Sequence, residues 1–289
     1  MRSEKEMLGL ILSTARGDER IRAVVLNGSR ANPAAPPDPF RDFDVVYGVT
    51  DPAPFTRNLE WIKQFGERMI LQLPDEMGES ALRTDGIYAY LMQFADGNRI
   101  DLTICPLAEL GKIVRDSLTV VLLDKDGILG HVPPPHEGDY YPKPPTAKEY
   151  GDCCNEFWWL CPYVAKALWR GEITNAKYFQ ESGLRLQLNN MIDWFIGVKT
   201  EFRKSSGKYG KYYRAYLEPD LWRLLERTYS DADIDRTWDA ISAAGELFRR
   251  TALSVAEHFD FEYPRGDDER VTAHLRHVRS LPGDAAEIY

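Results

Sequence analysis

The spacing of apolar residues changes once along this chain of 289 residues, and that change constrains the fold more than any other feature. Up to about residue 126 the apolar side chains occur in short runs typical of strands, with segments of helical spacing between them. From residue 147 onward the spacing is helical almost throughout. The sequence therefore predicts an α+β protein, in which a mixed β-sheet flanked by helices is followed by an all-α helical bundle.

The expected elements can be placed along the chain. In the first part the expected strands are 21–27, 43–49, 68–73, 86–94, 98–105 and 118–123, and the expected helices are 3–15, 55–65 and 107–114. In the second part the expected helices are 149–171, 175–200, 220–229, 234–258 and 266–279.

A proline-rich segment separates the two patterns. Residues 126–146 hold six of the 18 prolines and three glycines, which is a composition typical of linkers. We therefore expect a first domain over 1–130, a linker over 131–146 and a helical domain over 147–289.

The charge balance limits the kinds of partner. With 36 Lys and Arg against 45 Asp and Glu, the formal net charge is −9. This balance disfavours a nucleic-acid-binding protein, which needs a basic surface, and favours cationic partners. The absence of a Ser-His-Asp order and of an HExxH motif disfavours hydrolase and zinc-enzyme functions.

The sequence favours a cytoplasmic protein that does not interact with a membrane. Its first residues lack the apolar core of a signal peptide, and no window reaches the roughly 20 apolar residues of a membrane span. The cysteines form no CxxC pair, and we expect them to be buried thiols of a reducing compartment: Cys105, Cys153, Cys154 and Cys161.

Acidic residues at the start of an expected strand are the main chemical signal. Asp42 and Asp44 lie two residues apart, so alternation along the strand places both carboxylates on one face. Carboxylates this close repel each other unless a cation lies between them, and magnesium prefers such oxygen ligands. Asp101 has the same alternation in its own strand. If the two strands are neighbours, three carboxylates meet, as a two-metal phosphoryl or nucleotidyl transfer site requires.

A turn before the first of these strands suits phosphate binding. Gly28 allows a phosphate to approach the backbone closely, and the hydroxyl of Ser29 and neighbouring N–H groups can donate to phosphate oxygens. The prolines that follow at 33, 36, 37 and 39 limit any helix at this turn to about one turn.

These residues resemble a known superfamily. Gly28-Ser29, followed after twelve residues by Asp42-x-Asp44 and later by a strand with Asp101, is similar to the polymerase-β-type nucleotidyltransferases. More narrowly, NGSRANP, RDFDVVY, NRIDLTI and CNEFWWLCPYVAKALWRGEITNAK resemble the aminoglycoside 6-adenylyltransferases, which modify streptomycin. The resemblance extends from about residue 3 to about residue 280.

The resemblance implies a role for each matching position. Gly28 and Ser29 would hold the β and γ phosphates of ATP. Asp42 and Asp44 would bind magnesium, with two ions expected, and Asp101 would be both a metal ligand and the base that accepts the proton of the attacking hydroxyl. For Arg30 two alternatives stay open, since it either stabilises charge on the transferred phosphate or orders the loop.

The helical part should then bind a polyhydroxylated polycation, which calls for acids and flat aromatic surfaces. Glu156 and Trp159, three residues apart in one helix, supply both, and Asp152 lies one turn earlier. We expect Phe157 and Trp158 to belong to the helix core instead.

Lysines of the helical part are candidates for contact with ATP phosphates. Lys166 and Lys177 are isolated cations on apolar helices, whereas Lys208 and Lys211 lie in the glycine-containing segment SSGKYGKYY. The alternative is that these lysines are solvated or stabilise helix C-termini.

The sequence thus predicts transfer of AMP from Mg–ATP to a hydroxyl of streptomycin, bound in a cleft between the halves, which would give antibiotic resistance. Another aminoglycoside, a lincosamide or a protein side chain stays open as acceptor, and so does a non-catalytic nucleotide-binding module. The presence of all three acids argues against that last alternative. The sequence does not indicate an oligomeric state.

Overall fold

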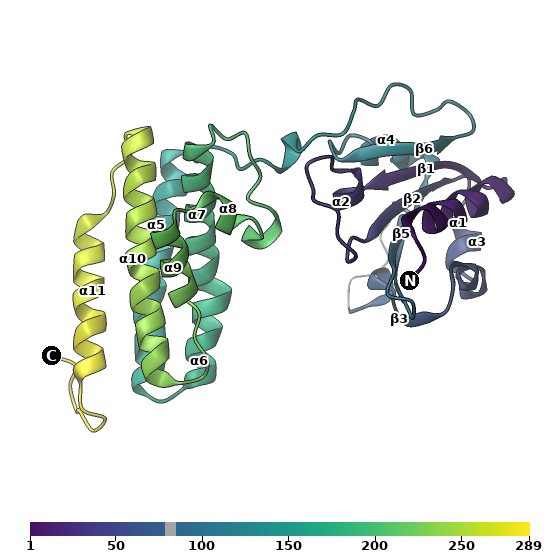
Figure 1. The fold of residues 1–289 in the computed structure, drawn as a ribbon. Helices are drawn as coiled ribbons and strands as arrows, with labels where there is room; N and C mark the ends of the chain where they lie inside the picture. The colour runs from purple at the N-terminus through teal and green to yellow at the C-terminus, as the bar shows by residue number, and fades with distance from the viewer. Residues whose placement is uncertain (79–84) are drawn as a thin grey trace. The chain divides into compact units, whose positions relative to one another are not determined.

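The structure is a computed structural model that describes residues 1–78 and 85–289. The chain forms two compact units, residues 1–139 and 140–289, and each unit is described by itself (Figure 1).

The first unit is built on a six-stranded sheet with strand order β3-β4-β5-β2-β1-β6. The neighbours β2 and β5 run parallel, and the other neighbouring pairs are antiparallel. The expected mixed sheet is therefore confirmed. Its strands are β1 (Ile21–Asn27), β2 (Phe43–Val49), β3 (Arg68–Gln72), β4 (Tyr88–Phe94), β5 (Arg99–Pro106) and β6 (Thr119–Asp124).

Helices cover both faces of this sheet. The helix α1 (Glu4–Gly17) buries Met7 and Ile11 in a core that includes Phe43 and Tyr47. On the opposite face, α4 (Leu107–Ile113) packs Leu110 against a smaller core. Because α4 is short and lies over β2 and β5 near Gly48, it leaves the N-terminal ends of these two strands uncovered on its side.

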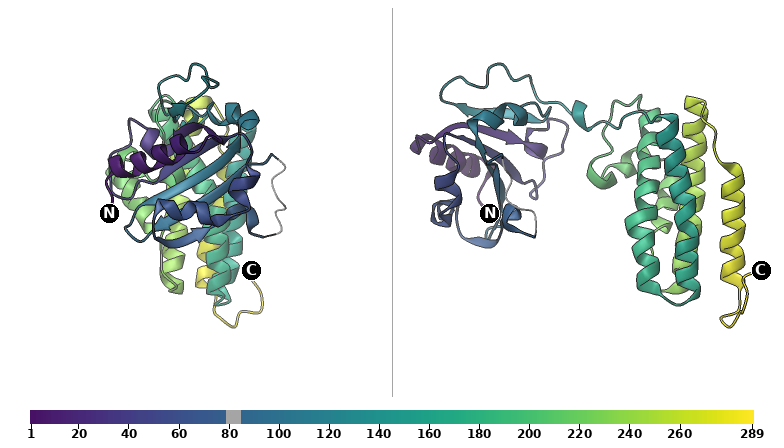
Figure 2. Two further views of the ribbon diagram at one scale, coloured as in Figure 1. Left: turned by 90° about the vertical axis from the view of Figure 1, so that its right-hand side faces the viewer. Right: turned by 180° about the vertical axis from the view of Figure 1, so that it is seen from behind.

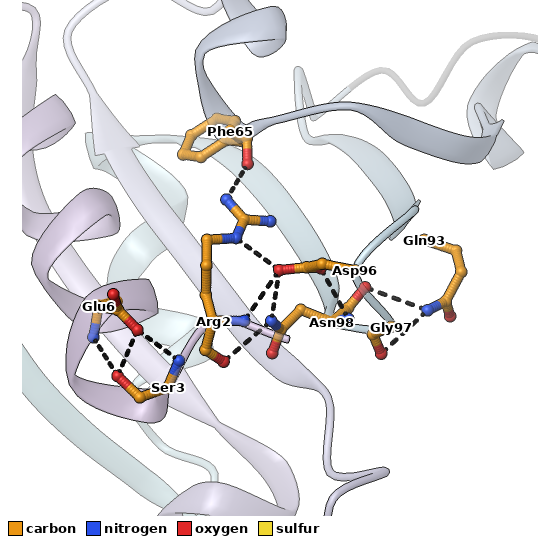
Figure 3. Close-up of polar contacts among 8 residues, drawn as sticks. All are labelled: Arg2, Ser3, Glu6, Phe65, Gln93, Asp96, Gly97 and Asn98. Atoms are coloured by element: carbon orange, nitrogen blue, oxygen red, sulfur yellow. Dashed lines mark hydrogen bonds and ion pairs between the residues drawn. The ribbon is translucent and has the colours of Figure 1, made fainter.

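The start of the chain is fixed to the turn between β4 and β5. The Nε atom of Arg2 donates to Asp96 at 2.7 Å, and its Nη1 atom donates to the carbonyl of Phe65 (Figure 3). Asn98 donates to the same carboxylate and to the carbonyl of Arg2. A capping box between Ser3 and Glu6 then begins α1.

The expected helix over 55–65 is interrupted. It consists of α3 (Ala53–Thr56) and the 3-10 helix η1 (Leu59–Phe65). Asn58 separates them because its backbone is extended and its side chain accepts a hydrogen bond from the N–H of Glu60, which caps η1. The remaining short helices of this unit are α2 (Gly28–Ala31), η2 (Pro74–Glu76) and η3 (Gly138–Tyr140), of which the last extends into the second unit.

The second unit is the expected helical bundle. Long helices lie side by side in it, and α5 contacts α7, α10 and α11 (Figure 2). In the described residues no helix is long and apolar enough to span a membrane. The helices are α5 (Ala147–Trp169), α6 (Ile173–Tyr178), η4 (Phe179–Leu184), α7 (Arg185–Lys199), η5 (Lys208–Gly210), α8 (Tyr213–Tyr216), α9 (Pro219–Arg227), α10 (Ile234–Phe259) and α11 (Arg265–Ser280).

Aromatic residues of α5 form the centre of this bundle. Phe157 stacks on Phe248 of α10 with ring centroids 3.8 Å apart, and Trp158 meets the same ring edge-on. Both residues of α5 are buried, which confirms that they belong to the core. The expected burial of the cysteines is confirmed as well, since all four are buried free thiols.

The single expected helix over 175–200 differs from the structure. It is divided by the π-helical turn η4, which connects α6 to α7. A Cβ at Gly183, within that turn, would lie 2.7 Å from Cδ1 of Leu160. The glycine thus allows the turn to approach α5 closely, and periodicity alone does not reveal this extra residue.

Candidate active site

Three polar residues form a row across neighbouring strands of the first unit. Asn27 of β1 is the ladder partner of Asp44 in β2, and Asp44 is the ladder partner of Asp101 in β5. Asp42 lies directly before β2, two residues from Asp44. The row ends where α4 no longer covers the sheet. The two strands that carry the acids are therefore neighbours, as the sequence hypothesis required.

The turn after β1 lies directly against one of these acids. Gly28 has a φ of +69°, and a Cβ at this position would lie 2.2 Å from Oδ2 of Asp44. Only glycine fits here, because both the backbone conformation and the available space exclude a side chain. Gly28 and Ser29 begin α2, which is four residues long, and this agrees with the limit that the prolines impose.

Burial and mutual repulsion affect the acids strongly. Burial, followed by the charges of Asp101 and Asp42, raises the pKa of Asp44 to about 6. Burial also raises the pKa of Asp42, and Arg99 opposes this shift. The site thus holds more negative charge than its surroundings stabilise, which is a property expected of a cation-binding site.

One cation of the chain already lies among these acids. Arg99 donates from Nε and Nη2 to the two carboxylate oxygens of Asp101, each at 2.7 Å, and its Nε lies 3.6 Å from Oδ2 of Asp42. In the described residues, no group of three or more His, Cys, Asp or Glu is arranged to hold a metal ion.

The donor chemistry nevertheless fits magnesium. Asp42, Asp44 and Asp101 offer oxygen ligands only, which magnesium prefers. Asn27 donates to Thr119 at 2.8 Å, while its buried Oδ1 has no hydrogen-bond partner in the described residues. An acceptor left unpaired beside the acids is expected where a further cation or donor binds.

Several residues beside the acids did not stand out in the sequence. A cavity of about 410 Å³ extends from Asp44 and Asp101 to α4 and the residues that follow it. Strand alternation would have found Asn27 and Thr103, because they lie on the same face as Asp44 and Asp101. Lys112, near the end of α4, and Asp116, in the segment after it, carried no signal, since a lysine or aspartate in such a place is usually solvated. The added polar residues are Asn27, Thr103, Lys112 and Asp116.

The contacts of Arg30 support a role in ordering the loop rather than in stabilising charge on the transferred phosphate. Its side chain is only 7% exposed, and its guanidinium carbon lies 3.7 Å from the ring centre of Phe43. It donates to the carbonyls of Arg41 and Asp42 and forms an ion pair with Glu4. Arg30 therefore holds the segment before β2 in place.

In the helical unit, two of the three expected substrate residues line one groove. Asp152 and Glu156, one turn apart on α5, face a cavity of about 650 Å³. Its wall combines carboxylates, amides and one indole, which are the groups expected to bind a polyhydroxylated cation. The lining residues are Glu149, Asp152, Cys153, Asn155, Glu156, Gln187, Asn190 and Trp194.

Trp159 is not part of this groove. It is 61% exposed and lines a separate cavity of about 520 Å³, together with Tyr163, Lys166 and Trp169. The aromatic residue of the acidic groove is Trp194 of α7, which sequence spacing did not indicate. Residues three apart on a helix differ in direction by about 60°, and in this bundle that is enough to separate them.

The expected phosphate-binding lysines lie in different places. Lys166 is exposed above the ring of Tyr163. Lys177 donates to the carbonyl and hydroxyl of Ser230, at 2.9 and 2.6 Å, so it connects α6 to the loop between α9 and α10. The remaining two, Lys208 and Lys211, lie over the rings of the tyrosines that follow them in the loop before α8. The structure does not bring the four together.

Comparison with known proteins identifies the family. The family model for streptomycin adenylyltransferase matches residues 1–278. The chain belongs to the streptomycin adenylyltransferase family. It is therefore a nucleotidyltransferase, and the alternative of a non-catalytic module is not supported. An adenylyltransferase implies ATP as co-substrate and, usually, a divalent metal ion.

Curated relatives agree along nearly the whole chain. An aminoglycoside 6-adenylyltransferase of Campylobacter jejuni is 40% identical over 93% of each chain. Those of Bacillus subtilis and Staphylococcus aureus are 38% and 34% identical, over 93% and 91% of this chain and 95% and 94% of their own. A crystal structure of an aminoglycoside 6-adenyltransferase from Bacillus subtilis covers 97% of this chain and 100% of that chain, at 33% identity and a TM-score of 0.48.

Proposed function

We propose that this nucleotidyltransferase transfers AMP from Mg–ATP to a hydroxyl of an aminoglycoside, with streptomycin as the first candidate. The product would be an O-adenylylated antibiotic that no longer binds its ribosomal target, so the enzyme would give resistance. The observation that carries the proposal is the ladder pairing of Asp44 with Asp101 beside the Gly28 turn.

The residues of the first unit divide the chemistry among them. Asp42, Asp44 and Asp101 would hold magnesium, which when bound would stabilise negative charge on the phosphate oxygens. Gly28 and Ser29 bind the β and γ phosphates through backbone N–H groups and the serine hydroxyl. Asp101 accepts the proton of the attacking hydroxyl, the hydroxyl oxygen bonds to the α-phosphorus, and pyrophosphate leaves.

The acidic groove of the helical unit supports a cationic acceptor. Asp152 and Glu156 supply carboxylates for guanidinium or ammonium groups, and the amides of Asn155 and Asn190 can bind sugar hydroxyls. Trp194 offers a flat surface for a guanidinium group. Asp152 already pairs with Lys148, so Glu156 is the acid of this groove that a neutral or anionic acceptor would leave without a partner in the described residues.

The test is pyrophosphate release from Mg–ATP with streptomycin, spectinomycin, kanamycin, lincomycin or no acceptor, followed by mass spectrometry of the products. We expect release that depends on streptomycin and a product heavier by one adenylyl group. If pyrophosphate release depends on another compound of the panel, that compound is the acceptor instead of streptomycin. Modification of the protein itself would instead indicate a protein side chain.

Matched variants connect the reaction to the proposed site. Asp101→Asn removes the base and a metal ligand, and we expect transfer to fall by at least about 1,000-fold. Glu67→Gln neutralises an exposed acid of the same unit and should leave transfer unchanged. Transfer that survives Asp101→Asn would refute the assigned base.

A further inference from the structure

The guanidinium of Arg99 contacts two of the three acids that are proposed to bind magnesium. It contacts both oxygens of Asp101 and lies 3.6 Å from Oδ2 of Asp42. A planar guanidinium that meets a carboxylate through two parallel hydrogen bonds is the strongest form of this contact. In this arrangement Asp101 has no oxygen that is not bound to Arg99.

The fold explains why this arginine reaches the acids. Arg99 and Asp101 are two residues apart in β5, so both side chains lie on the face that carries Asp44. Arg99 begins the strand and is 39% exposed, which leaves its long side chain free to turn back along the strand or to move into solvent. Its attachment is therefore reversible.

The positive charge of Arg99 also offsets the repulsion within the site. Its Nε lies 2.7 Å from Oδ1 of Asp101 and 3.6 Å from Oδ2 of Asp42, within ion-pair distance of both acids. Three acids next to a buried strand would otherwise destabilise the protein whenever no metal is bound.

We propose that Arg99 is a built-in counter-ion, which neutralises Asp42 and Asp101 in the metal-free enzyme and competes with the divalent cation for them. This proposal rests on the proposed metal site. Binding of the metal–nucleotide then requires the guanidinium to leave Asp101, which also frees that carboxylate to act as a base. Arg99 is thus a positioning residue that sets the affinity for metal.

The test measures binding of Mn²⁺ alone, by electron paramagnetic resonance of the free ion, to the full chain without nucleotide. We expect Arg99→Gln to tighten Mn²⁺ binding by about tenfold, because it removes a positive charge that pairs with Asp101 and Asp42. In EDTA the same variant should unfold at a lower temperature than wild type. Addition of Mn²⁺ should raise the unfolding temperature of the variant by more than it raises that of wild type.

Two further variants separate charge from structure. Arg99→Lys keeps the charge but loses the bidentate contact, so its Mn²⁺ affinity should lie between those of wild type and Arg99→Gln. Arg22→Gln removes an arginine of the same unit that pairs with Asp126 and Glu19, far along the sheet from the acids. Its Mn²⁺ affinity should equal that of wild type.

A double variant tests whether Arg99 acts through Asp101. In an Asp101→Asn background, Arg99→Gln should change Mn²⁺ affinity by much less than tenfold, because one of the two contested carboxylates is gone. Unchanged or weaker Mn²⁺ binding by Arg99→Gln, with wild type binding normally, would overturn this inference alone. If wild type binds neither Mn²⁺ nor Mg–ATP, the proposed metal site fails together with it.

Discussion

The backbone of Gly28 lies so close to Asp44 that a Cβ at residue 28 would be 2.2 Å from Oδ2 of that carboxylate. The turn that is proposed to bind phosphate and the strand that carries the proposed metal ligands are therefore in direct contact. Any side chain at residue 28 must displace the acid, the turn or both.

Gly28→Ala should accordingly impair catalysis. We expect transfer to fall by about 100-fold, since a shift of about 1 Å in a reacting group is enough for such a loss. Strain at the positive φ should also lower the free energy of unfolding by about 1 kcal/mol. Steady-state kinetics and thermal unfolding measure the two effects. Gly9→Ala, in α1 with open space around it, is the control, and equal behaviour of the two variants would disprove the role of this contact.

Asp44→Asn should separate stability from activity. Burial and repulsion raise the pKa of Asp44 to about 6, so the charged form destabilises the metal-free protein at pH 7. Removing the charge should abolish transfer and yet raise the free energy of unfolding in EDTA by about 1–3 kcal/mol. Chemical denaturation with and without Mg²⁺ measures this. A variant that is inactive because it is less stable would contradict the interpretation.

Glu156→Gln should weaken binding of the cationic acceptor without affecting ATP. We expect the KM for streptomycin to rise by about tenfold, which corresponds to about 1.4 kcal/mol, with the KM for ATP unchanged. The rise should shrink at high salt, because screening weakens the interaction in wild type. Glu226→Gln neutralises an exposed acid of α9 and is the matched control. If the two variants have the same KM for streptomycin, the groove does not bind the acceptor.

Trp194 and Trp159 line different cavities of the helical unit, which allows a direct comparison. Trp194→Leu should raise the KM for the acceptor by about tenfold, because it removes the aromatic wall of the acidic groove. Trp159→Leu changes the other cavity and should leave that KM unaltered. A larger rise in KM for Trp159→Leu than for Trp194→Leu would instead support Trp159 as the aromatic residue that binds the acceptor.

Asp268→Asn should destabilise the helical unit in a pH-dependent way. Arg249 donates two hydrogen bonds of 2.5 Å to Asp268, and Tyr263 donates a third of 2.7 Å. These contacts lower the pKa of this carboxyl although burial, the largest single effect, raises it. Because Arg249 is about one-third exposed, we expect a loss of about 2–3 kcal/mol at pH 7.

The sign of the pH dependence follows from the lowered pKa. The stabilisation by Asp268 is complete above the ordinary aspartate pKa near 4 and is lost as pH falls through the lowered value. The difference in unfolding free energy between wild type and Asp268→Asn should therefore shrink below about pH 4. Denaturant titrations from pH 7 to pH 3 measure it, and a difference that grows on acidification would contradict the assignment.

Strand alternation was enough to place Asp44 and Asp101 on one face, because the side-chain direction in a strand has a fixed period of two. Asp42 lies one residue before β2. Alternation was not enough to predict that Arg99 turns back onto Asp101, since a long side chain can point either way from the same backbone. In the same way, helical spacing grouped Glu156 with Trp159, but the neighbouring helix determines which groove each one lines. Local patterns thus predicted the elements, and tertiary packing determined the contacts.

The parallel pairing of β2 with β5 also has a consequence for how the molecule folds. Asp44 and Asp101 are 101 − 44 = 57 residues apart in sequence, and β3 and β4 lie between them in the chain. Closing so long a loop is slow compared with the formation of hairpins and helices. During synthesis Asp42 and Asp44 therefore remain apart from Asp101 until β5 emerges, so the repulsion between Asp101 and the other two acids opposes the pairing of β5 with β2.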